Sequence, residues 1–88
     1  MQTKESLERE EKRQLRRITR AIDEAEKDIA TLDEKIALCE EELANPDHAD
    51  DHVKLMEIQA AIDALQEEHD AIAENWLELQ EQLESNAK

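Results

Sequence analysis

Apolar residues recur along the chain at alternating intervals of three and four positions, in two separate series. Each series holds nine positions without a slip, and together they cover most of the 88 residues. This spacing is the a and d pattern of a heptad repeat, in which the apolar stripe of one helix packs against a partner helix. The predicted coiled-coil core is Leu15, Ile18, Ile22, Ala25, Ile29, Leu32, Ile36, Cys39 and Leu43 in the first series, and Leu55, Ile58, Ile62, Leu65, His69, Ile72, Trp76, Leu79 and Leu83 in the second.

The two series are separated by residues 44–51, Ala-Asn-Pro-Asp-His-Ala-Asp-Asp, which hold the single proline of the chain. Proline disfavours helical backbone at the preceding residue, so the first helix should end near Asn45. Asp50 or Asp51 can accept a first-turn N–H and cap the second helix. An alternative cap is Asn45, with Pro46 in the first turn.

A connection this short favours antiparallel neighbours. The sequence therefore predicts an all-α fold, a single antiparallel two-helix coiled-coil hairpin, and favours a monomeric hairpin over an oligomer. The predicted domain is residues 1–88, with a first helix at about 5–44, a turn at about 45–50 and a second helix at about 51–85. Residues 1–11 are expected to form a frayed lead-in, because the seam positions expected there hold Glu8 and Glu11.

The heptads leave two pairing registers open. One pairs residues whose numbers sum to 94 and sets Ile18 against Trp76, and the other pairs residues whose numbers sum to 101 and sets Ala25 against Trp76. The second register is favoured, because a small residue facing a large one suits interdigitated packing.

Composition excludes several classes of function. The chain has no glycine, so it cannot build the phosphate-binding loops of nucleotide-binding folds. The longest apolar run, residues 36–39, is too short for a membrane span, and we expect a cytoplasmic protein with no membrane partner. One cysteine allows no internal disulfide, which agrees with a reducing compartment. A two-helix hairpin also encloses no pocket for acid or base catalysis, so no catalytic residue and no enzyme activity are predicted.

Charge is divided unevenly along the chain, whose net charge is −14. Residues 1–20 carry seven basic and four acidic groups, a balance of +3, whereas residues 21–88 carry four basic and twenty-one acidic groups, a balance of −17. The local positive charge identifies the start of the first helix as a candidate interaction surface. Its candidate contact residues are Arg9, Lys12, Arg13, Arg16, Arg17 and Arg20.

Two interpretations of this basic end are open. In an antiparallel hairpin it lies beside the end of the second helix, and the simpler interpretation is local charge compensation that fixes the orientation of the hairpin. The alternative is contact with the phosphate backbone of RNA or DNA, without base stacking, since no aromatic residue interleaves with the arginines. The acidic residues available for compensation are Glu74, Glu78, Glu81 and Glu84.

Other residues with possible chemistry have simpler explanations. His48 and His52 are four residues apart and would hold a divalent metal only if that stretch were helical, so no metal site is predicted. His69 is expected to be a polar seam residue that specifies register, with a pH switch as the alternative. Cys39 is interpreted as an apolar filler and Trp76 as a core residue, with an interface anchor as the alternative for the tryptophan.

Several segments, taken in order, resemble a known family. They are the arginine-rich start, residues 36–44 (Ile-Ala-Leu-Cys-Glu-Glu-Glu-Leu-Ala), the proline-containing acidic turn at 45–51, and residues 74–79 (Glu-Asn-Trp-Leu-Glu-Leu). Together they resemble the C-terminal coiled-coil domain of the ABC-F proteins, bacterial ATPases with two ATP-binding cassettes and no membrane segment. The resemblance implies an accessory domain of a larger chain that works in translation on the ribosome, with DNA binding attributed to this domain in some members. ATP and Mg²⁺ would belong to the cassettes of the parent, and no cofactor is expected in this chain.

The chain departs from the family pattern at two places. His48 stands in the turn where relatives often carry an aromatic residue, which puts a turn-packing contact in doubt. The second helix is acidic throughout, which confines the nucleic-acid surface to Arg9 through Arg20. The expected function is a non-catalytic accessory domain that contacts the ribosome, RNA or DNA through its basic end, or that positions the parent protein. The alternative is a structural coiled-coil module for protein–protein interaction or self-association, whose exposed apolar residues would be Leu38, Met56 and Leu77.

Overall fold

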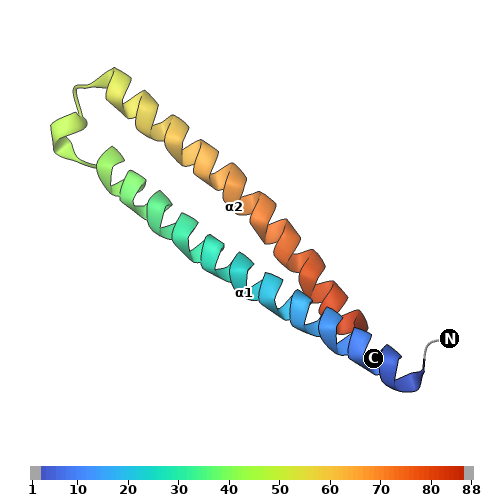
Figure 1. Cartoon of the computed structure of the whole chain (residues 1–88). Helices are drawn as coiled ribbons and strands as arrows, with labels where there is room; N and C mark the ends of the chain where they lie inside the picture. Colours follow the sequence, from blue (N-terminus) through green and yellow to red (C-terminus); the bar gives the residue numbers. More distant parts are fainter. Residues whose placement is uncertain (1–2, 87–88) are drawn as a thin grey trace.

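The computed structural model describes residues 3–86, which form two long helices joined by a short turn (Figure 1). Helix α1 spans Lys4–Leu43, the 3₁₀ helix η1 spans Pro46–His48, and helix α2 spans His52–Asn86. The two long helices run antiparallel and pack against each other, and no strand occurs between residues 3 and 86. The predicted all-α helical hairpin is confirmed.

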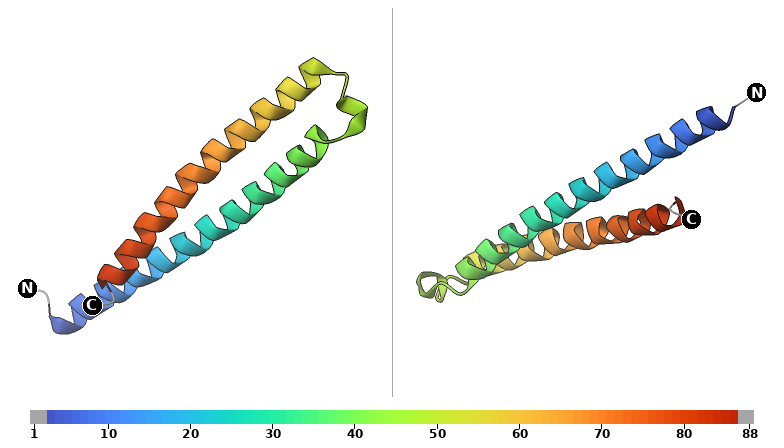
Figure 2. Two further views of the ribbon diagram at one scale, coloured as in Figure 1. Left: turned by 180° about the vertical axis from the view of Figure 1, so that it is seen from behind. Right: turned by 90° about the horizontal axis from the view of Figure 1, so that it is seen from below.

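The hairpin is a rod with extents of 71 × 19 × 14 Å. Helix α1 has 40 residues and α2 has 35, and the first turns of α1 extend beyond the end of α2 (Figure 1, Figure 2). These turns start at a cap, because the Thr3 hydroxyl accepts a hydrogen bond from the Ser6 N–H at 3.3 Å. Residues 4–11 of the predicted frayed lead-in are therefore helical here, and residues 1–2 of it lie outside the described residues.

Both caps considered for the turn are present, and each serves a different helix. The Asn45 side chain accepts a hydrogen bond from the Asp47 N–H at 3.0 Å and starts η1, in which Pro46 is the first residue. The Asp51 carboxylate accepts a hydrogen bond from the Lys54 N–H at 3.0 Å and caps α2. No residue from 3 to 86 has a positive backbone φ, so this hairpin closes without glycine.

The core is the seam between α1 and α2. All eighteen predicted seam positions are buried or half-buried. None of the described side chains is fully buried, because a two-helix seam leaves the rim of each residue open to water. Stability therefore depends on the length of the seam rather than on a few deeply buried groups. The six most buried residues are Ile18, Ile22, Ala25, Leu32, Ile58 and Ile62.

Two polar contacts across the seam define the register. The Trp76 Nε1–H donates a hydrogen bond to Glu26 Oε1 at 3.2 Å. The His69 Nε2 lies 3.1 Å from Asp33 Oδ1. Glu26 and Asp33 are seven residues apart on α1, and His69 and Trp76 are seven residues apart on α2. The two contacts therefore have the same position in successive heptads and indicate the same register. If numbers summed to 94, His69 would lie opposite Ala25, about 12 Å along α1 from Asp33, so the contacts support the register in which numbers sum to 101.

Candidate nucleic-acid interface

Six basic side chains of α1 gather on one surface, and all six are exposed. Successive residues of a helix are rotated by about 100°, which places four of the arginines within an arc of about 60°. The same rotation places Ile18 and Ile22 on the opposite side of α1, so the arc faces away from α2. We call this surface the basic stripe. Arg9, Arg13, Arg16 and Arg20 form its centre, and Lys12 and Arg17 flank it on either side.

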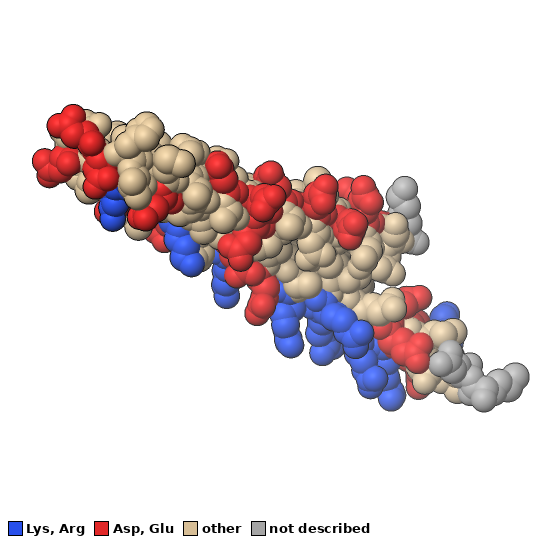
Figure 3. Space-filling model, turned by 90° about the horizontal axis from the view of Figure 1, so that it is seen from above, with Lys and Arg blue, Asp and Glu red and all other residues tan. Residues whose placement is uncertain are grey.

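The basic stripe is separated from the acidic surface of the molecule. Figure 3 shows Lys and Arg side chains along one edge of the rod, most densely toward the start of α1, whereas Asp and Glu side chains cover much of the opposite edge and of the middle of this face. From Lys12 to Arg20 the chain carries five basic groups and no acidic one. A concentration of one sign of charge creates a local field that attracts anions even when the net charge of the molecule is negative.

The glutamates of α2 do not neutralise the basic stripe by direct pairing. Among residues 3–86, His69 contacts the carboxylates of Asp33 and Asp70, and no ion pair is found between the basic stripe and α2. The reason is geometric, because side chains that point away from the seam would have to reach around a helix about 10–12 Å wide. Local charge compensation between the two helix ends would therefore act through the longer-range field and not through direct ion pairs. The glutamates concerned are Glu74, Glu78, Glu81 and Glu84.

A shallow hollow of about 370 Å³ lies on one flank of the basic stripe, lined by Leu15, Arg16, Thr19, Arg20 and Asp23. The Thr19 hydroxyl donates its hydrogen bond to the Leu15 carbonyl at 2.8 Å, so the donors available to an anion are the two guanidinium groups. Arginine presents a planar fork of donors that matches phosphate oxygens. The Asp23 carboxylate offsets one of the two positive charges, so the lining keeps a net positive charge of one, and no aromatic residue is present to stack on a base.

The two histidines near the turn are not placed as metal ligands on one helix. His48 lies in η1, and His52 is the first residue of α2, with the non-helical residues of the turn between them. Within residues 3–86, no group of three or more His, Cys, Asp and Glu side chains is arranged to hold a metal ion. The spacing of four residues therefore does not produce the shared helical face that such a pair would need.

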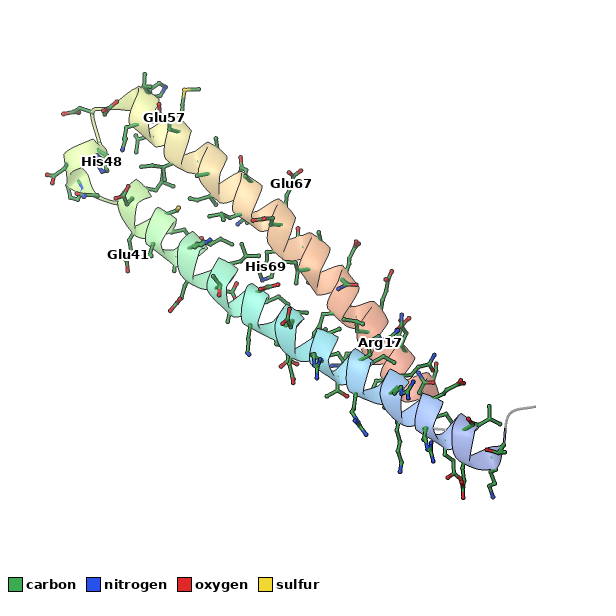
Figure 4. The ribbon with its side chains drawn as sticks, viewed as in Figure 1. Arg17, Glu41, His48, Glu57, Glu67 and His69 are labelled. Atoms are coloured by element: carbon green, nitrogen blue, oxygen red, sulfur yellow. The ribbon has the colours of Figure 1, made fainter. Side chains whose placement is uncertain are left out.

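The polar seam residue His69 is held between the helices. Its side chain is 28% exposed and points from α2 toward α1 (Figure 4). Besides the contact with Asp33, its Nδ1 lies 3.7 Å from Asp70 Oδ1 on its own helix. Cys39 and Trp76 are likewise half-buried in the seam. All three residues therefore contribute to packing between the helices.

Large apolar side chains outside the seam are exposed. The residues predicted to be exposed, Leu38, Met56 and Leu77, have 62%, 65% and 56% of their surface open to water. Val53 at 67% and Leu7 at 46% are further members that the sequence reasoning missed. Both lie near a helix start and outside the heptad series, which is the signal that could have identified them.

The described residues form an antiparallel two-helix hairpin that carries a basic stripe on the outer side of α1. Over residues 6–81 the chain matches the family described as ABC transporter C-terminal domain. Because this match covers most of its length, the chain belongs to that family, and it is an accessory domain of an ABC protein rather than a catalytic domain. No curated protein and no solved structure matches the chain. Neither α1 nor α2 has an apolar stretch that could cross a bilayer, as far as residues 3–86 are concerned.

Proposed function

We propose that the basic stripe contacts the phosphate backbone of nucleic acid, and that the domain is the accessory C-terminal domain of an ABC-F type ATPase acting on the ribosome. The observation that carries the proposal is the run from Lys12 to Arg20, with five exposed basic side chains, no acidic residue between them and no ion pair to α2. Membership of the ABC transporter C-terminal domain family supports the accessory role. ATP and Mg²⁺ would bind the cassettes of the parent protein, in the cytoplasm.

The length of the basic stripe along α1 matches a run of successive phosphates on one strand of a nucleic-acid duplex. Arg9 and Arg20 are separated by about 17 Å along α1 at 1.5 Å per residue. One strand of a duplex presents a phosphate about every 3.4 Å along its axis, so about five phosphates span that length. Guanidinium groups can therefore engage several successive phosphates. Contacts of this kind position a duplex without reading its sequence.

The test is the salt dependence of binding, measured by fluorescence anisotropy with labelled RNA and DNA duplexes of the same sequence. Each phosphate that is neutralised contributes about −0.9 to the slope of log K against log salt, so four contacts give about −3.6. Affinity should then fall about 150-fold between about 50 and about 200 mM salt. A variant without four of the arginines should have a less negative slope, by up to about 3.6. It combines Arg13→Gln, Arg16→Gln, Arg17→Gln and Arg20→Gln.

A matched control changes basic residues far from the stripe. Lys35→Gln together with Lys54→Gln alters the net charge but should leave the slope within experimental error. If the 88-residue chain binds neither duplex even at low salt, or if the arginine variant keeps the full slope, the contact role fails. Positioning of the parent protein and protein–protein interaction would then be the remaining roles for this domain.

A structural interaction module is the second candidate, favoured by the exposed apolar side chains outside the seam. Such residues on a rod could join it to a partner helix or to a second copy. Sedimentation equilibrium across a range of concentrations tests self-association, because a monomeric mass throughout removes a second copy as the partner and leaves only a helix of another protein. A rise in mass with concentration would favour the module.

A further inference from the structure

A groove lies between the two helices near the turn, at the opposite end of the rod from the basic stripe. Its volume is about 610 Å³, and both helices contribute to its lining. The apolar part of the lining comes from Leu38 and Cys39 of α1 and from Ile58 and Ala61 of α2. Ile58 is 7% exposed and forms the floor, whereas Leu38 is 62% exposed and forms an open edge.

The groove lies at a level of the hairpin where two small side chains, Cys39 and Ala61, are part of the lining. In the register whose numbers sum to 101, Cys39 lies opposite Ile62, with Ala61 beside it. The thiol of Cys39 fills less space than the leucine and isoleucine side chains that occupy most of the seam, and the methyl group of the exposed Ala61 covers little of the surface beside it, so the hollow stays open to water. Apolar surface that remains in contact with water favours an occupant that covers it.

The polar edge of the groove is mainly acidic. Glu41 and Glu42 line it from α1 and Glu57 from α2, and Lys54 is the one basic residue of the lining. Figure 4 shows Glu41 and Glu57 on the two helices near the turn. None of these four side chains forms an ion pair among the described residues. Residues 40–57 as a whole carry seven acidic groups and one basic group, a balance of −6.

We propose that this groove binds a lysine- or arginine-rich amphipathic helix of a protein partner, with a large aliphatic side chain placed against Leu38 and Ile58. An apolar lining bordered by carboxylates is complementary to a helix that has an apolar face and basic flanks. Nucleic acid carries the wrong sign of charge for this site. The proposal concerns the end of the rod that the basic stripe does not reach, so it stands independently of the proposed nucleic-acid contact.

The test uses the single cysteine of the chain as a reporter, since Cys39 lines the groove. The probe is a leucine–lysine peptide of about 14 residues, roughly four helical turns, with leucines at positions i, i+3, i+4 and i+7. Saturating peptide should slow the alkylation of Cys39 by iodoacetamide about tenfold or more, because an occupied groove blocks access to the thiol. A peptide with glutamate in place of lysine should neither bind nor protect.

Two variants with matched controls locate the binding site. Leu38→Ala should weaken peptide binding about tenfold, whereas Leu77→Ala, which removes an exposed leucine elsewhere, should not. Glu57→Gln should lower the salt dependence of binding, whereas Glu78→Gln should leave it unchanged. Leu38 is exposed, so its replacement should preserve the helical circular dichroism signal.

Three results would overturn the proposal. The first is equal binding of the basic and acidic peptides, and the second is binding of the basic peptide without protection of Cys39. The third is protection of Cys39 that increases with the concentration of the chain alone, which would identify a second copy as the occupant. The arginine variant of the basic stripe should bind the peptide as the unmodified chain does, so the two proposals fail separately.

Discussion

Exchanging the large and the small residue of one seam pair tests the register directly. Ala25, which is 5% exposed, faces Trp76, whose indole is half-buried and hydrogen bonded to Glu26. Trp76→Ala alone opens a cavity at this level, and Ala25→Trp alone overfills it. The double variant again places one large and one small residue opposite each other, so part of the lost stability should return.

The expected free energies follow from the burial of the two residues. Replacing a fully buried tryptophan by alanine costs about 3–5 kcal/mol, and for the half-buried Trp76 we expect about 2 kcal/mol, including its exposed hydrogen bond. Overfilling the seam with Ala25→Trp should cost about 1–3 kcal/mol. Two independent changes would then cost about 4 kcal/mol together, whereas a shared pair should recover at least about 1.5 kcal/mol. For a domain of this size that recovery corresponds to about 6–12 °C in Tm.

Thermal unfolding followed by far-ultraviolet circular dichroism measures the recovery in a double-mutant cycle. The control combines Trp76→Ala with Ala30→Trp, because Ala30 is an exposed residue of α1 and does not face the seam. This control should show no recovery. If the Ala25 and Trp76 changes are simply additive, the two residues are not paired, and the register whose numbers sum to 101 is wrong.

Two further substitutions test single contacts. His69→Leu should raise Tm by about 4–8 °C, because about 1 kcal/mol of apolar burial in the seam should outweigh the loss of the exposed contact with Asp33; a lower Tm would show that this contact is worth more than the burial. Asp51→Ala should cost about 1 kcal/mol, since the Lys54 N–H loses its acceptor, whereas Asp50→Ala should stay within about 0.5 kcal/mol. Urea unfolding compares these two variants, and equal effects would contradict the assignment of Asp51 as the cap of α2.

The hairpin could be predicted because the heptad period and the turn are local properties of the sequence. The register could not be derived in the same way, since a shift of seven residues again sets apolar positions against apolar positions. The contacts that distinguish the registers involve Glu26 and Asp33, which lie beside the seam and not in it. The sizes of Ala25 and Trp76 had favoured the register whose numbers sum to 101, and these two contacts agree with it.

The basic stripe was predicted in part from the sequence, whereas the groove near the turn was not. The basic residues were visible as a charge cluster, but the sequence reasoning did not work out in which direction the helix presents each of these side chains. That direction follows from the rotation of about 100° per residue. The groove was not predicted, because its lining combines Cys39 of α1 with Ile58 and Ala61 of α2, and which residues share one level of the hairpin depends on the register. Only Leu38, an apolar residue outside the seam, hinted at it.

The length of the rod has a mechanical consequence for partners bound at its two ends. The molecule extends 71 Å, and the basic stripe and the groove lie toward opposite ends of it. A rotation of about 10° about one end of such a lever moves the other end by about 12 Å, roughly the width of a helix. A small tilt at a surface that binds one end can thus decide whether a partner at the other end is within reach, with no change of conformation inside the hairpin.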